Sequence, residues 1–471
     1  METIPLKSNI SNFKYSIISQ MIVIIFGIIR ALIIPILLGV SDFGYWQVYL
    51  LYAGFVCIFS FGFNDGIYLR YGGKQKTDLP WSKLRGSFYL YFIALLIISL
   101  LFVVTIEYIH LTPEKSLTFY YVIVNIGLMG FSSLFLFIFQ TTNQIKKYSI
   151  YMLVDKLIFL ALLAYIYQYS NVGFEALMII DCISKVILMI AMAVDCRNDL
   201  FGKVSNFLIS LQEFYKNINV GIKLMLANLG SMLVLNMSRF FVEQYYTLEE
   251  FSTFSFGITL TNIFLMAMNG VAVALYPFLK RLPEQNYSQV YAELTSALSM
   301  FLFLSLFAYY PVHYFVFNYM SEYKTVLSYF NILFVLSLLQ IKMNLTINTF
   351  YKVLREERAL LKANFSSVVV GLLLSVFVVC FYKTVELMAF ALLVTIVFRV
   401  YQSDIFINTI LGSKNIGSAV LELSVFIVFI IATSTLELYM SFVMTFLFMI
   451  TYVYIQKNNI KKWLDIVKGK E

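Results

Sequence analysis

Long uninterrupted apolar runs constrain this chain more than any other feature of its sequence. Fourteen stretches of about 20 residues are almost free of charged side chains, and about 20 residues of α-helix are enough to cross the hydrocarbon core of a bilayer. The runs do not alternate with a period of two, as membrane β-strands would. Only 13% of the 471 residues are charged, about half of the share found in soluble proteins. The sequence therefore predicts an all-α polytopic membrane protein.

The loop charges predict how the chain crosses the membrane. With the N-terminus in the cytoplasm, nearly every Lys and Arg between spans falls on the cytoplasmic side, and the outer loops hold only Lys115, Lys324 and Lys383. This bias is that of the positive-inside rule, so we expect both termini in the cytoplasm. The net charge of +8 then reflects topology, and no nucleic-acid partner is expected. The spans are expected at residues 15–38, 45–69, 87–109, 117–141, 148–168, 174–196, 218–241, 253–277, 292–317, 325–350, 364–382, 386–411, 416–435 and 437–455.

The remaining composition argues against catalysis and against a bound metal. The outer loops are short, so a catalytic domain outside the membrane is not expected. The four Cys lie apart in or beside apolar spans, as small buried side chains do. His110 and His313 are isolated in sequence, which gives no zinc-ligand spacing. We expect no enzyme activity, no cofactor and no metal.

The two halves of the chain open with the same spacing of basic residues. Lys14 and Arg30 lie 16 positions apart, as do Lys223 and Arg239. Polar residues share the helix face of each arginine at three- and four-residue spacings. We therefore predict a duplicated six-helix unit, with both copies in the same orientation around a central cavity. The expected domains are an N-terminal lobe at 1–196, a cytoplasmic inter-lobe linker at 197–216, a C-terminal lobe at 217–412, and a helical hairpin with a basic cytoplasmic tail at 413–471.

Several cations lie inside the predicted spans. A charge at the centre of a span costs roughly 2.5–3.5 kcal/mol on insertion scales, so these side chains should face protein or water. Arginine is permanently charged and offers a fork of donors that matches phosphate. Asp181 precedes Lys185 by four residues and Glu243 follows Arg239 by four, so these two cations can instead pair along their own helices. The candidate substrate-binding residues are Arg30, Arg239, Lys342, Arg399 and Lys185.

Buried acids are the candidates for ion coupling. Asp65, Asp155 and Asp404 lie within predicted spans, where a carboxylic acid can carry a proton or neutralise a cation. The sequence leaves both roles open. Pro35 follows Arg30 by five residues, and a proline inside a helix is expected to bend it there.

Residues 34–73 carry a recognisable series of turns. Its elements are Leu38-Gly39, Asp42-Phe43-Gly44-Tyr45-Trp46, Phe61-Gly62 and Arg70. This series resembles the opening of the Wzx-type lipid-linked oligosaccharide flippases, which handle O-antigen and polysaccharide units. That family belongs to the multidrug/oligosaccharidyl-lipid/polysaccharide exporter superfamily. Beyond residue 73 the likeness rests on span number, length and lobe symmetry.

The resemblance implies a function, a location and partners. Such proteins move undecaprenyl-pyrophosphate-linked oligosaccharide repeat units from the cytoplasmic to the periplasmic leaflet of the bacterial inner membrane. They do so by alternating access around a cationic cavity, for O-antigen, lipopolysaccharide or other surface polysaccharide biosynthesis. The implied partners are the lipid-linked glycan and membrane lipid, with a polysaccharide polymerase and a chain-length regulator left open.

Three other functions remain in competition. A drug/cation antiporter of the same superfamily would need acids for a cationic cargo, and a peptidoglycan-precursor flippase would share the anionic cargo. A membrane-bound polysaccharide polymerase, an enzyme, typically needs a large basic loop outside the membrane. The short outer loops make the polymerase the remotest of the three.

Overall fold

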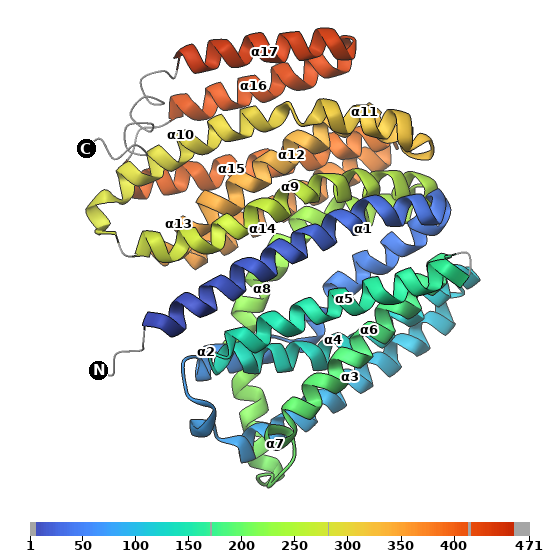
Figure 1. The fold of residues 1–471 in the computed structure, drawn as a ribbon, viewed down its shortest axis with the longest axis vertical. Helices are drawn as coiled ribbons and strands as arrows, with labels where there is room; N and C mark the ends of the chain where they lie inside the picture. The colour runs from blue at the N-terminus through green and yellow to red at the C-terminus, as the bar shows by residue number, and fades with distance from the viewer. Residues whose placement is uncertain (1–5, 170–171, 281, 413–415, 456–471) are drawn as a thin grey trace. The chain divides into compact units, whose positions relative to one another are not determined.

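All regular structure in the described residues is helical. The computed structural model describes residues 6–169, 172–280, 282–412 and 416–455 (Figure 1). The α-helices are α1 (Leu6–Gly54), α2 (Phe63–Tyr71), α3 (Trp81–Ile109), α4 (Pro113–Thr141), α5 (Ile145–Tyr169), α6 (Phe174–Asp195), α7 (Arg197–Leu200), α8 (Phe207–Tyr245), α9 (Leu248–Lys280), α10 (Tyr287–Leu306), α11 (Tyr309–Tyr319), α12 (Phe330–Lys342), α13 (Asn348–Leu354), α14 (Glu357–Phe381), α15 (Val385–Leu411), α16 (Ile416–Thr435) and α17 (Leu438–Ile455). The all-α prediction is confirmed for these residues.

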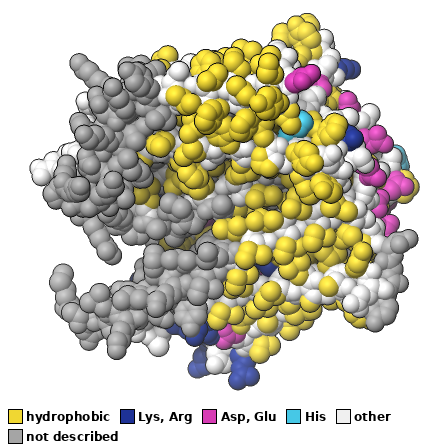
Figure 2. Space-filling view, turned by 45° about the horizontal axis from the view of Figure 1, so that its top comes forward, with side chains coloured by type: hydrophobic (Ala, Val, Ile, Leu, Met, Phe, Trp, Pro, Cys, Tyr) yellow, Lys and Arg dark blue, Asp and Glu magenta, His cyan; other side chains and the backbone are white. Residues whose placement is uncertain are grey.

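Ten of the described helical segments are long and apolar enough to cross a membrane. Two shorter apolar helices, Ala419–Thr435 and Leu438–Tyr452, lie where the final hairpin was expected. Apolar side chains cover most of the visible face in Figure 2, and charged side chains lie mostly at its margins. This surface is that of a protein surrounded by lipid. The count of fourteen spans stays a prediction, and the basic tail expected beyond residue 455 lies outside the described residues.

The chain divides into two compact units, Met1–Leu229 and Gly230–Glu471. In the first unit α4 packs against α1, α3, α5 and α6. In the second unit α12 holds the equivalent place, packed against α9, α10, α15 and α16. The division falls inside α8, and the stretch expected as a linker at 197–216 contains α7 and the first turns of α8.

In the first two predicted spans the helix is interrupted at positions that differ from those expected. The backbone of α1 remains helical through Pro35 and breaks at Gly39, with φ 69° and ψ 175°. Glycine adopts this positive φ at little cost, so the break falls at the residue that permits it. The continuous second span expected at 45–69 is wrong in its middle. There a 3₁₀ turn over Phe55–Ser60 is followed by left-handed Phe61 and Gly62 before α2 begins.

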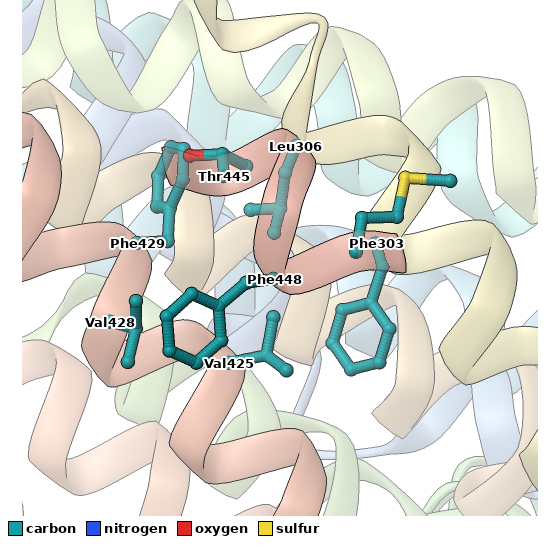
Figure 3. Close-up of a pocket in the computed structure, with 8 residues that line it drawn as sticks. Phe303, Leu306, Val425, Val428, Phe429, Thr445 and Phe448 are labelled. Carbon is teal, nitrogen blue, oxygen red and sulfur yellow. The ribbon is translucent and has the colours of Figure 1, made fainter. Parts of the chain in front are cut away.

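The second unit has two further irregularities and an attached hairpin. A π-helical turn, Met343–Ile347, separates α12 from α13, and π turns occur often at functional sites. The hairpin of α16 and α17 packs on α10, and Figure 3 shows the apolar side chains of this junction. The small cavity between them has a volume of ≈ 10 Å³, about the space of one water molecule. It is too small to hold a ligand.

Candidate functional site

Arg30 is a cation that forms no ion pair with the residues that the structure describes. Its guanidinium carbon lies 4.9 Å from the ring centre of Trp46 and 5.4 Å from that of Phe159. The Nη2 atom is buried and makes no hydrogen bond to the described residues. Cation–π contacts offset part of the cost of burying this charge, but they leave the donor unused.

Lys185 instead belongs to a closed polar network in the first unit. We call Tyr49, Asn125, Asp181 and Lys185 the first-unit network. Lys185 Nζ and the Tyr49 hydroxyl both donate to Asp181 Oδ2. Lys185 also donates to Asn125 Oδ1 at 2.6 Å, and Asn125 Nδ2 donates to the Tyr49 oxygen at 2.5 Å. The network joins α1, α4 and α6, and the ion pair anticipated from the four-residue spacing is present.

The two candidate coupling acids of the first unit have different surroundings. Asp155 on α5 accepts from Lys156 Nζ at 2.6 Å and from Ser184 Oγ at 3.4 Å. Asp65 is half-buried in the first turn of α2, where the positive end of the helix dipole favours a carboxylate. No hydrogen bond in the described part of the chain joins Asp65 to Asp155, and their coupling role stays a prediction.

Arg399 is the largest charged side chain buried in the second unit. It is 1% exposed, and no carboxylate pairs with it among the described residues. Its Nε donates to Asn364 Oδ1 at 2.9 Å and its Nη2 donates to Ser231 Oγ at 3.0 Å. These neutral partners connect α15 to α14 and α8. The full positive charge of Arg399 therefore remains inside the unit.

Lys342 and Asp404 lie together in a second buried cluster. We call Lys342, Asp404 and Glu422 the second-unit triad. Lys342 Nζ lies 3.0 Å from Glu422 Oε2 and 3.5 Å from Asp404 Oδ2. Ser299 and Tyr401 donate to Glu422 at 2.8 and 3.2 Å, and Tyr291 donates to Asp404. All three charges are at least nine-tenths buried, so the lysine is held by the protein's own acids.

Arg239 occupies in the second unit a position similar to that of Arg30 in the first. Its Nε donates to Ser255 Oγ at 3.4 Å and its guanidinium lies 5.8 Å from the Phe251 ring centre. Ser255 follows Arg239 by 16 residues, just as Trp46 follows Arg30 by 16. Each arginine therefore rests on the next helical segment of its own unit, at the same sequence distance. The duplication itself stays a prediction.

Sequence reasoning missed the attachment of α8 to the first unit. Arg70 forms a 2.6 Å ion pair with Glu213 and donates to Asn217, and Tyr71 donates to Glu213 at 2.6 Å. Burial raises the pKa of the Tyr71 hydroxyl, so it donates as a neutral phenol. Small residues allow the backbones to approach closely: a Cβ on Gly221 would lie 2.0 Å from the Gly62 oxygen. A pair of glycines in two apolar runs was the available signal.

One larger cavity opens where α9, α13 and α15 end. It measures ≈ 570 Å³ and is lined by Lys280, Glu284, Tyr287, Val353, Leu354, Arg355, Ile410 and Leu411. Lys280 Nζ donates to the Val353 carbonyl at 3.0 Å. Helix C-termini carry negative dipole ends, which together with Glu284 offset the two cations. The cavity thus has no clear preference for an anion. No group of three His, Cys, Asp or Glu suited to a metal occurs in the described part of the chain.

Comparisons with known proteins place this geometry in context. A family model described as "Polysaccharide biosynthesis protein" matches residues 10–283. The structure is similar to that of lipid II flippase MurJ in an inward closed conformation, with a TM-score of 0.65 and 13% identity, over 96% of this chain and 100% of that one. It is also similar to an inward-facing multidrug resistance MATE family transporter of the MOP superfamily, with a TM-score of 0.56 and 13% identity over 84% and 94% of the chains.

A third structure is a MOP superfamily transporter from Pyrococcus furiosus, described as having a binding pocket of reverse polarity that suggests a different function. Its TM-score is 0.51, with 13% identity over 85% of this chain and 94% of that one. No curated protein matches the chain in sequence. At such low identities the three structures establish a shared fold.

Proposed function

Because the chain belongs to the polysaccharide biosynthesis protein family, whose model matches residues 10–283, we propose that it is a flippase for lipid-linked oligosaccharides. It moves undecaprenyl-pyrophosphate-linked repeat units from the cytoplasmic to the periplasmic leaflet by alternating access, for O-antigen or another surface polysaccharide. The family match carries this proposal. The fold shared with MurJ and MATE proteins supports transport as the activity.

The geometry of Arg30 supports an anionic cargo. A pyrophosphate is a compact anion that does not cross hydrocarbon unaided. A guanidinium with a buried, unused donor can give it charge-assisted hydrogen bonds. Trp46 and Phe159 exclude water from one side of that guanidinium, which strengthens its attraction for an anion. We therefore assign the pyrophosphate first to Arg30.

The roles that we propose for the other candidate cations depend on the partners that each side chain has. Arg399 is bound to neutral hydrogen-bond acceptors, so its charge adds to the attraction for an anion, and Arg239 is proposed as a further contact for it. Lys342 and Lys185 are paired with carboxylates, so we propose that they act through those pairs. Asp65, Asp155 and Asp404 remain the candidates for ion coupling. The protein would work in the bacterial inner membrane with both termini in the cytoplasm, and without catalysis.

The test replaces Arg30 in a strain that lacks the chromosomal gene. We expect Arg30→Ala to lower surface polysaccharide at least about tenfold, since a desolvated charge–phosphate contact contributes more than 1.4 kcal/mol. Arg30→Lys should retain part of the activity because it keeps the charge and loses the fork. Lipid-linked intermediates should accumulate in the Ala variant. Membrane levels of each variant, measured by immunoblot, control for folding.

An unchanged polysaccharide level in Arg30→Ala and in Arg399→Ala, at normal protein levels, would refute the cationic site. Loss of polysaccharide without accumulated intermediates would place the protein at another step. If the protein were a polymerase, its inactive variants would accumulate a different intermediate, namely single lipid-linked repeat units that have already reached the outer leaflet. Binding of a lectin to intact spheroplasts detects the glycan that is exposed on the outer leaflet, and this measurement separates these cases.

The peptidoglycan-precursor flippase is the second candidate, because the structure matches lipid II flippase MurJ over 96% of this chain. Both cargoes would present a pyrophosphate to Arg30. We expect this chain to fail to support growth when a host is depleted of its lipid II flippase, while it restores surface polysaccharide in its own deletion strain. Growth rescue at ordinary expression levels would reverse the assignment of cargo.

A further inference from the structure

Among the described residues Arg30 forms no ion pair, although two acids lie on neighbouring helices of its unit, Asp155 on α5 and Asp181 on α6. Asp181 is joined to α1 through Tyr49, and it is only 7% exposed. In an apolar interior the attraction between opposite charges is strong. A free Asp181 would therefore draw the guanidinium toward itself and use the donors needed for an anion. Something must keep each acid occupied.

Each of these acids is occupied by its own lysine. Lys185 and the Tyr49 hydroxyl share Asp181 Oδ2, and Lys156 lies 2.6 Å from Asp155. Asn125 fixes the arrangement, since it accepts from Lys185 and donates to the Tyr49 oxygen. Tyr49 on α1 thus contacts the Asp181–Lys185 pair of α6 directly, and Asn125 on α4 fixes Tyr49 and Lys185.

An aromatic stack connects this network to Arg30. The rings of Trp46 and Tyr49 stack with centroids 5.2 Å apart and an interplanar angle of 25°. Arg30 rests on Trp46, while Tyr49 donates to Asp181. The arginine therefore meets the network through the ring of Trp46 and not through an ion pair.

We propose that Lys185 is a positioning residue that neutralises Asp181 and so keeps Arg30 available to a phosphate-type anion. This inference rests on the proposed function for the nature of the anion. It gives Lys185 a role other than contact with the cargo. Removal of the Lys185 charge frees Asp181 to capture Arg30, so anion binding falls even though the anion-binding side chain is intact. Removal of both charges restores it.

The test measures binding of inorganic pyrophosphate to the purified full-length chain in lipid nanodiscs by titration calorimetry. We expect Lys185→Gln to weaken binding at least about tenfold, a change that one strong charge–charge contact produces. Glutamine keeps a polar contact to Asn125 and removes only the charge. The double variant Lys185→Gln/Asp181→Asn should return to within about threefold of the unmodified chain, because coupled sites are non-additive. If Lys185 touched the anion itself, the double variant would stay as weak as the single one, and the proposal would fall.

Further variants ensure that the test does not depend on whether one particular variant folds. Asp181→Asn alone should bind pyrophosphate at least as tightly as the unmodified chain, because no carboxylate at position 181 then competes for Arg30; weakening by Asp181→Asn would overturn the proposal. Arg30→Gln should abolish binding, and if it does not, the anion lies elsewhere and the inference fails. Absence of binding by the unmodified chain would overturn the proposed anionic cargo itself, and this inference with it. Elution profile and thermal unfolding confirm that each variant is folded.

Discussion

At the scale of single residues, the two units differ in how many carboxylates neutralise their buried lysine. In the first-unit network one lysine and one aspartate neutralise each other, with hydroxyl and amide groups completing the hydrogen bonds. In the second-unit triad one lysine faces two carboxylates, and four neutral donors are aimed at the acids. Burying a charge costs least when the charge is both paired and hydrogen-bonded. Both clusters meet this condition, whereas Arg30 meets it only through aromatic rings.

The second-unit triad gives a prediction for stability. Lys342→Ala leaves Asp404 and Glu422 together without their cation, and loss of one partner of a buried pair costs about 3–5 kcal/mol. We expect a clear fall in the temperature of thermal unfolding, measured on the detergent-solubilised protein. Lys342→Met combined with Glu422→Gln should unfold at a higher temperature than Lys342→Ala.

Lys324→Ala is the matched control. Lys324 lies in the 3₁₀ turn η4 (Ser321–Ser328), where its side chain is exposed and its ammonium group contacts the Phe317 ring of α11. Its removal should change stability by less than about 1 kcal/mol. Equal effects of the two lysine substitutions would show that the triad does not hold the second unit together.

At the scale of elements, close approach of backbones decides where α8 is held. Gly62, Gly66 and Gly221 place α2 and α8 so close that an added Cβ would meet backbone atoms at 2.5 Å or less. The Arg70–Glu213 ion pair lies beside this contact. The apolar pattern of α8 identifies a membrane helix, but its partner depends on which surfaces lack side chains. The kink at Gly39 has a similar origin, in a residue that tolerates positive φ.

The glycine contact can be tested directly. Gly221→Ala introduces a methyl group 2.0 Å from the Gly62 oxygen, and forced overpacking costs typically about 1–3 kcal/mol. We expect lower unfolding temperature and reduced yield of folded protein. Gly127→Ala on α4 is the control, since a Cβ there meets nothing within 4 Å. A destabilised Gly127→Ala with an unaffected Gly221→Ala would contradict the contact.

At the scale of the whole molecule, the two units share a packing arrangement that fits the predicted repeat. In each unit a central helix, α4 or α12, packs on a later long helix, α6 or α15. A lysine bridges each of these pairs: Lys185 on α6 reaches Asn125, and Lys342 on α12 reaches Asp404. The lysine therefore lies on a different helix of the packed pair in each unit. Two parallel copies require an even number of spans in each, which the loop charges also favour.

The expected topology gives a prediction for the intact protein in cells. Reporter fusions that are active only outside the cytoplasm should be active at residues 111 and 323, where Lys115 and Lys324 mark the outer loops. Fusions at residue 145 and at the C-terminus should be inactive in that assay and active with a cytoplasmic reporter. A periplasmic C-terminus would require an odd number of spans and would contradict the fourteen that are expected.

The sequence by itself determined the class of protein, because an apolar run of about 20 residues has few alternatives to a membrane helix. It also located Arg30 and the Asp181–Lys185 pair, since spacing along one helix is visible in the sequence. The tertiary structure decided which helices share each charge. Pairs such as Lys342–Glu422 and Arg399–Asn364 join residues 80 and 35 positions apart, and no local pattern encodes such contacts. Packing therefore separates the cations that are neutralised within the protein from Arg30, which retains an unused donor.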